Sequence, residues 1–158
     1  MATTTSRLDY AGFRRLAPEA DRALLAISAA TKQSALGAEL IQLVKVRASL
    51  VNRCSFCLAM HRREARRLGI SGERLEALAR WRESPCFTPP ERAALAWTDA
   101  LTQLADGGVP DEVYREVSSA FSDADLAALT SVVATINAWN RIAVAYRFPA
   151  APDAEGGE

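Results

Sequence analysis

Two cysteines and the only histidine of this 158-residue chain fall within eight consecutive residues. Cys54 and Cys57 form a CxxC pair, and His61 follows the second cysteine by four residues. On a helix, Cys57 and His61 would lie one turn apart on the same face. An imidazole beside a thiol can accept its proton, and a second cysteine one turn away can then close a disulfide. The spacing therefore predicts a thiol redox centre with Cys57 as nucleophile and Cys54 as resolving thiol.

Two physical effects act on the acidity of these thiols in opposite directions. A thiol at the start of a helix gains from the positive end of the helix dipole, which lowers its pKa. Burial raises the pKa because the thiolate loses its hydration. The sequence leaves open which effect dominates. It also leaves open a purely structural role, in which two core thiols and a hydrogen-bonded core histidine carry no redox chemistry.

A metal site is a further alternative for these residues. Cys54, Cys57 and His61, together with Cys86, would supply a Cys₃His set of the kind that binds zinc. Structural zinc sites normally draw their ligands in two close pairs, whereas Cys86 has no second ligand nearby in the sequence. We therefore expect no metal, and we interpret Cys86 as a packed loop thiol.

The segment that follows the CxxC pair must position its side chains. An apolar helical stripe runs through the motif and turns its reactive residues inward, through Cys54, Cys57, Leu58, His61, Ala65 and Leu68. Four basic residues fall on the flanks and the opposite side of this helix, namely Arg62, Arg63, Arg66 and Arg67. Such a run is usually a solvated face. The alternative is a surface for an acidic partner or another subunit.

Length and composition fit a single globular domain, with 49% hydrophobic and 24% charged residues. Basic and acidic residues are equal in number, so net charge gives no reason to expect a nucleic acid or membrane partner. Neither a signal peptide nor an apolar membrane span is recognisable, and we expect a cytoplasmic protein. In that reducing compartment, a CxxC pair is more often catalytic or metal-binding than a permanent disulfide.

Helical periodicity, punctuated by cap and stop residues, predicts an all-α bundle of about seven helices. We expect a flexible N-terminus over 1–9, one helical domain over 10–148 and a disordered tail over 149–158. Predicted helices begin at Pro18, after Gly37, around the CxxC pair, at Ser71, at Thr88, at Pro110 and at Ser122. Thr88 and Glu91 form a capping box, while Gly69 and Gly107 mark helix ends.

The segment LVKVRASLVNRCSFCLAMH, residues 43–61, resembles the core motif of the alkylhydroperoxidase D (AhpD)-like branch of the carboxymuconolactone decarboxylase family. The stretches 81–98, 109–114 and 136–141 resemble later segments of that family, so the resemblance covers residues 10–148. The CxxCxxxH pattern is specific to the AhpD-like branch, because the decarboxylase branch shares the fold without the cysteine pair. The resemblance implies a helical subunit that assembles into trimers or hexamers, and thiol chemistry without a metal, haem or flavin cofactor.

The resemblance also implies a role for each residue of the motif. Cys57 matches the more buried cysteine that attacks a peroxide. Cys54 matches the more exposed cysteine that resolves the sulfenic acid and meets the electron donor. His61 matches the histidine paired with the attacking thiol. The substrate would be a peroxide or small disulfide, and the reductant an external dithiol, which in some relatives is a lipoyl protein.

One position departs from the family pattern. The family usually has a glutamate twelve residues before the first cysteine, where it begins a proton relay, and this chain has Gln42 there. A glutamine can hold hydrogen bonds but accepts no proton at physiological pH. Glu39, one turn earlier and about 4.5 Å away along the axis, is a candidate replacement, and a water molecule is another.

Three functions fit these observations. The main hypothesis is a thiol-dependent peroxidase or disulfide oxidoreductase. The second is a redox-sensing or interaction protein that keeps the CxxC pair but turns over slowly without the glutamate. The third is a decarboxylase-type small-molecule enzyme on the same fold, which would use His61 as its base without thiol chemistry.

Overall fold

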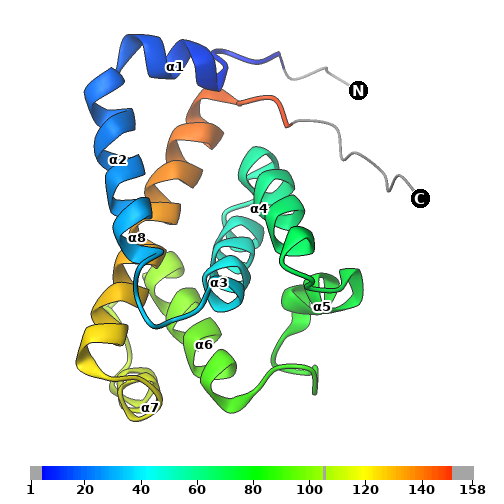
Figure 1. The fold of residues 1–158 in the computed structure, drawn as a ribbon, viewed down its shortest axis with the longest axis vertical. Coiled ribbons are helices and arrows are strands. Elements are labelled where there is room, and N and C mark those ends of the chain that lie inside the picture. Colours follow the sequence, from blue (N-terminus) through cyan, green and yellow to red (C-terminus); the bar gives the residue numbers. More distant parts are fainter. Residues whose placement is uncertain (1–4, 105, 151–158) are drawn as a thin grey trace.

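The computed structural model describes residues 5–104 and 106–150, and these ranges contain helices and connections but no strand. Eight α-helices and one 3₁₀ helix follow one another, which confirms the predicted all-α fold (Figure 1). The helices are α1 (Tyr10–Leu16), α2 (Pro18–Thr31), α3 (Ala38–Val51), α4 (Ser55–Arg67), α5 (Gly72–Ala77), η1 (Leu78–Arg80), α6 (Pro89–Gln103), α7 (Asp111–Ala120) and α8 (Asp123–Tyr146). In the described part of the chain, no helix combines the length and the apolar character that crossing a bilayer would need.

Helix α3 is central to the fold. It packs against α4, α6 and α8, while α2 runs beside α8 and α7 packs against α6 (Figure 1). Most of its side chains are buried, and three of the buried ones are polar, namely Gln42, Lys45 and Ser49. A core helix normally presents apolar residues on every buried face. The polar residues therefore mark the side of α3 that faces a polar site inside the fold and not its apolar core.

A buried carboxylate fixes α3 against α6. Asp99 on α6 accepts hydrogen bonds from Arg47 Nε at 2.6 Å, from Trp81 Nε1 at 3.1 Å and from Arg82 at 2.7 Å. Arg47 on α3 also donates to the carbonyl of Leu78 at 2.9 Å. Because charge-assisted bonds with several partners are geometrically specific, this cluster sets the orientation of α3 about its own axis.

The helix starts follow the predicted cap residues closely. The Thr88 backbone N–H donates to the Glu91 carboxylate at 2.8 Å, which is the capping box expected at the start of α6. Ser122 accepts from the backbone N–H of Asp125 at 3.2 Å and begins α8. Local side-chain chemistry was therefore sufficient to locate these boundaries.

Three details differ from the sequence prediction. Helix α1 was not expected, and it forms because Asp9 caps it, accepting from the Gly12 N–H at 2.7 Å, while Phe13 enters the core. Helix α6 ends at Gln103, before Gly107, because Leu104 has a positive φ of 27°. Leu68 is 42% exposed, since it follows the last turn of α4 and leaves the buried stripe.

The predicted flexible ends fall in part on residues 1–4 and 151–158, which lie outside the described residues. Within the described chain, the N–H groups of Arg7 and Leu8 donate to the Tyr146 carbonyl at 3.0 and 3.3 Å. Residues just before α1 thus bond to the end of α8. This contact brings both ends of the described chain to the same side of the molecule (Figure 1).

Candidate active site

The CxxC pair sits at the start of α4. Cys54 is the N-cap residue, and its Sγ accepts from the backbone N–H of Cys57 at 3.4 Å. Both cysteines are free thiols and both are buried, at 2% and 1% exposure. The inward direction predicted for Cys54, Cys57 and His61 is confirmed. The expected contrast between an exposed and a buried cysteine is absent from the described single chain.

The two thiols have different acidities. The pKa of Cys54 is lowered to about 7, chiefly because the neighbouring Cys57 thiol donates to its sulfur. The Cys57 backbone N–H and the Asn140 side chain add to that stabilisation and outweigh burial. The pKa of Cys57 is raised, because Cys57 is the donor between the two sulfurs and because it is buried. At rest, the first negative charge of the pair therefore belongs on Cys54, beside the helix N-terminus.

Asn140 on α8 belongs to the site, although the sequence pattern gives no reason to select it. Its side chain is fully buried, donates to Ser49 Oγ at 3.1 Å and accepts from Asn52 Nδ2 at 2.9 Å. It also lowers the pKa of both cysteines. A buried amide held from two sides gives the thiolate a fixed dipole without adding a charge.

The imidazole of His61 is held by a chain of two hydrogen bonds. Its Nδ1 lies 3.1 Å from Gln42 Oε1, and Gln42 Nε2 donates to Glu64 Oε2 at 3.0 Å. The pKa of Glu64 is lowered to about 2, first by its interaction with His61, so the carboxylate is ionised and can only accept. It therefore fixes the amide of Gln42, whose oxygen requires a proton on His61 Nδ1. The second ring nitrogen, Nε2, is left as the basic atom.

His61 remains neutral in this arrangement. Burial lowers its pKa from the ordinary value of 6.5, and the nearby Lys45 charge acts in the same direction. Glu64, with its Oε2 3.7 Å from His61 Nδ1, partly opposes the shift. A neutral imidazole with a free nitrogen can accept a proton, which an imidazolium cannot.

The carboxylate of the site comes from Glu64 and not from Glu39. Glu39 is 61% exposed and lies 3.8 Å from Arg74, away from Gln42. Glu64 stands three residues after His61 on α4, a spacing that places two side chains on neighbouring parts of one helix face. That spacing was visible in the sequence. Glu64 was not among the residues that the motif selected.

The two cysteines line different cavities. Cys57 and His61 border a cavity of about 200 Å³ between α2, α3, α4 and α8. Cys54 borders a wider one of about 500 Å³ between the start of α4 and the end of α8, with Arg53 and Arg147 in its wall. Phe56 lines both cavities and stands between them. Although no hydrogen bond joins His61 to Cys57 in residues 5–104, both face the same space.

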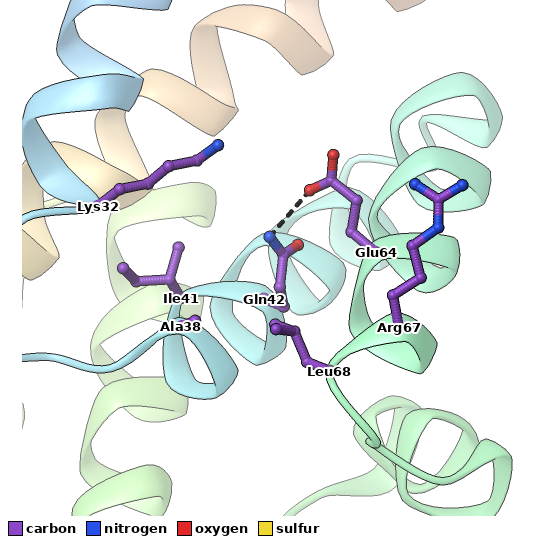
Figure 2. Close-up of a pocket in the computed structure, with 7 residues that line it drawn as sticks. All are labelled: Lys32, Ala38, Ile41, Gln42, Glu64, Arg67 and Leu68. Atoms are coloured by element: carbon purple, nitrogen blue, oxygen red, sulfur yellow. Dashed lines mark hydrogen bonds between the residues drawn. The ribbon is translucent and has the colours of Figure 1, made fainter.

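A third cavity, of about 340 Å³, lies on the other side of the relay (Figure 2). Figure 2 shows the Gln42–Glu64 hydrogen bond, with Lys32 and Arg67 extending on either side of the carboxylate. Glu64 lines this cavity as well as the one that contains Cys57, and its side chain is 41% exposed. The far end of the relay is thus open to solvent, from which protons can reach it.

The zinc alternative finds no support in the described residues, where no group of three or more His, Cys, Asp and Glu side chains could hold a metal ion. Cys86 is on the loop before α6, and its sulfur lies 3.0 Å from Ser84 Oγ. The prediction of a packed thiol at Cys86 is wrong, because that side chain is exposed. Its chain neighbour Phe87 occupies the core instead.

Known proteins match this sequence and this fold. The model of the carboxymuconolactone decarboxylase family matches residues 18–100, just over half of the chain. The uncharacterised protein YdfG of Bacillus subtilis is 33% identical over 133 residues, which cover 84% of this chain and 90% of YdfG.

Solved structures extend the likeness. A protein of unknown function from Agrobacterium tumefaciens, provisionally described as the antioxidant defence protein AhpD, superposes with a TM-score of 0.86 and 38% identity, over 93% of this chain and 99% of that one. A peroxidase-related protein from Ralstonia eutropha, described as an alkylhydroperoxidase AhpD core, has a TM-score of 0.78 over 90% of this chain and 76% of its own. At 19% identity, the second likeness concerns the fold alone.

The state of His61 can be measured directly, because it is the only histidine in the chain. We expect nitrogen-15 NMR of the imidazole to show a proton on Nδ1 at pH 7 and a titration midpoint below 6.5. Glu64→Gln should lower the midpoint further, because the carboxylate favours the charged ring. Glu39→Gln is the matched control and should leave it unchanged. A proton on Nε2 in the wild type would contradict the relay.

Proposed function

We propose that this chain, which belongs to the carboxymuconolactone decarboxylase family as an AhpD-like member, is a thiol peroxidase whose CxxC pair reduces peroxides. The observation that carries the proposal is the shared cavity of Cys57 and His61. A nucleophilic sulfur and a neutral base there face a space that a small substrate can enter, while Gln42 and Glu64 hold the base in one tautomer.

In the first step, His61 accepts the proton of Cys57 at Nε2, directly or through a water in the cavity. The Cys57 thiolate then attacks the terminal oxygen of the hydroperoxide. An S–O bond forms as the O–O bond breaks, and the departing alkoxide takes the proton back from His61 and leaves as an alcohol. Cys57 is now a sulfenic acid. Apolar and aromatic side chains make up much of the rest of the cavity lining, which suits an organic peroxide.

In the second step, Cys54 attacks the sulfur of the sulfenic acid. The Cys57 backbone N–H and the Asn140 side chain lower its pKa independently of the Cys57 thiol and so favour its thiolate form. A disulfide forms between Cys54 and Cys57, and the released hydroxide is protonated to water. An external dithiol then restores both thiols by exchange. Because Cys54 borders the wider cavity, we place the approach of that reductant there and not at the peroxide side.

The redox-sensing alternative rested on the absence of a glutamate at position 42. We infer that the ionised carboxylate of Glu64, one hydrogen bond beyond Gln42, serves in place of that glutamate, which favours turnover over sensing. The decarboxylase-type alternative uses His61 as a base and has no need of the thiols. It is separated from the main proposal by substitution of the cysteines.

Substitution of single cysteines tests the assigned roles. We expect Cys57→Ser to reduce peroxide consumption at least about a hundredfold, because the attacking atom is lost. Cys54→Ser should stop the cycle at the sulfenic acid of Cys57, which dimedone traps and peptide mass spectrometry locates. The matched control is Cys86→Ser, which removes an exposed thiol and should leave the rate unchanged. Retained turnover in Cys57→Ser would show that Cys57 is not the attacking thiol. A dimedone adduct on Cys54 in the same variant would reverse the roles of the two cysteines.

The relay gives a second kinetic expectation. Gln42→Glu would place a carboxylate within hydrogen-bond distance of the Glu64 carboxylate, and two such groups cannot both ionise easily. It would also remove the amide that fixes His61. We therefore expect the rate of peroxide reduction to stay level or fall. A rise of tenfold or more, measured in steady state with excess dithiol, would mean that Glu64 does not serve in place of the family's glutamate.

A further inference from the structure

Lys45 is a buried cation that the proposed cycle does not use. It lies on α3 one turn beyond Gln42, is 7% exposed and lines the 200 Å³ cavity together with Cys57 and His61. Within the part of the chain that the structure describes, its ammonium group forms no hydrogen bond or ion pair, and because it is not among the fully buried polar atoms that lack a partner, it keeps some contact with solvent. Lysine is rarely buried unless it is paired, because an ammonium group taken out of water loses its hydration.

The electrostatic surroundings of Lys45 leave room for a negative charge. Burial lowers its pKa, and the charge of Glu64 opposes the shift, although no ion pair joins the two side chains in the described residues. Oε2 of Glu64 accepts a hydrogen bond from Gln42 Nε2 at 3.0 Å. An anion that enters the cavity could therefore accept hydrogen bonds from the N–H groups of the Lys45 ammonium.

The charges around this cavity favour a ligand with a single negative charge. The sequence contains only two lysines, Lys32 and Lys45, and both line it. Lys32 is exposed at the end of α2, whereas Lys45 is deep. One carboxylate, that of Glu64, lines the same cavity. A net excess of one positive charge suits a carboxylate better than a phosphate dianion, which would also meet repulsion from Glu64.

Apolar and aromatic side chains make up much of the rest of the cavity lining, namely Tyr10, Leu25, Phe56, Met60, Ile136 and Trp139. The volume of about 200 Å³ exceeds that of an apolar cavity of roughly 150 Å³ that holds benzene. One ring or a short chain with a small substituent fits, whereas a long acyl chain does not.

We propose that this cavity selects small apolar acids, with the carboxylate on Lys45 and the reacting group at Cys57. The inference rests on the proposed function for its chemistry. The substrate is then an organic hydroperoxide that carries a carboxylate. It is reduced to the corresponding hydroxy acid and water, while the two thiols of the CxxC pair are oxidised to a disulfide.

Two hydroperoxides test this selectivity. Cumene hydroperoxide and its 4-carboxy derivative differ by one carboxylate far from the peroxide. We expect wild-type kcat/KM to favour the acid, and Lys45→Met to reduce the acid-to-neutral ratio about ten- to a hundredfold. The matched control, Arg67→Met, removes a positive charge from the neighbouring cavity and should hold the ratio within about twofold. An unchanged ratio in Lys45→Met overturns the inference, although peroxide reduction itself would stand.

Binding without turnover separates the inference from the proposed function. Calorimetric titration of the reduced wild-type chain with 4-isopropylbenzoate and with 4-isopropylbenzyl alcohol compares an acid with a neutral analogue. Tighter binding of the acid by about tenfold or more, lost in Lys45→Met, supports the acid site even if no peroxide is reduced. Equal binding of both compounds to the wild type overturns it, whether or not Lys45→Met folds.

Discussion

The hydrogen bond between the Glu64 carboxylate and the amide of Gln42 is the constraint on which the site depends. An ionised carboxylate can only accept, so it dictates which end of the amide faces it and which end faces His61. The tautomer of His61, and with it the position of the one basic nitrogen, follows from that orientation. A negative charge at the rim of the site thus determines which nitrogen of a buried ring carries the proton, through Gln42 and through its own proximity to the ring.

In the proposed function, the same geometry lets a glutamine stand where the family resemblance implies a glutamate. Gln42 passes on the direction of the hydrogen bonds, and Glu64 supplies the charge from the next helix. The two thiols also differ from each other in acidity and in surroundings. The low pKa belongs to Cys54, at the helix N-terminus, whereas Cys57 shares its cavity with the base. In the proposed cycle, Cys54 can therefore react as a thiolate, whereas Cys57, whose pKa is raised, depends on His61 to accept its proton.

Much of this arrangement could be predicted from sequence, and the reason is local. The capping box of Thr88 and the cap at Ser122 are contacts over three residues, and the inward face of Cys54, Cys57 and His61 follows from helical periodicity. What could not be predicted depends on contacts between distant helices. Neither the side chain of Asn140 on α8 nor the partner of Gln42 on α4 can be read from spacing, because register between packed helices is set by the whole core. The prediction that Cys86 is packed failed for the same reason, because packing against the core decided that Phe87 and not Cys86 points inward.

The central claim is that Cys54 and Cys57 act as one redox unit, and the thiol state of the protein tests it most directly. One equivalent of hydrogen peroxide is added to the reduced chain, and the product is examined by intact mass and peptide mapping. We expect a loss of two hydrogens that maps to a Cys54–Cys57 bond and is reversed by a dithiol. Two unreacted thiols at these positions, or oxidation confined to the exposed Cys86, would contradict it and would leave His61 as the base of a different chemistry.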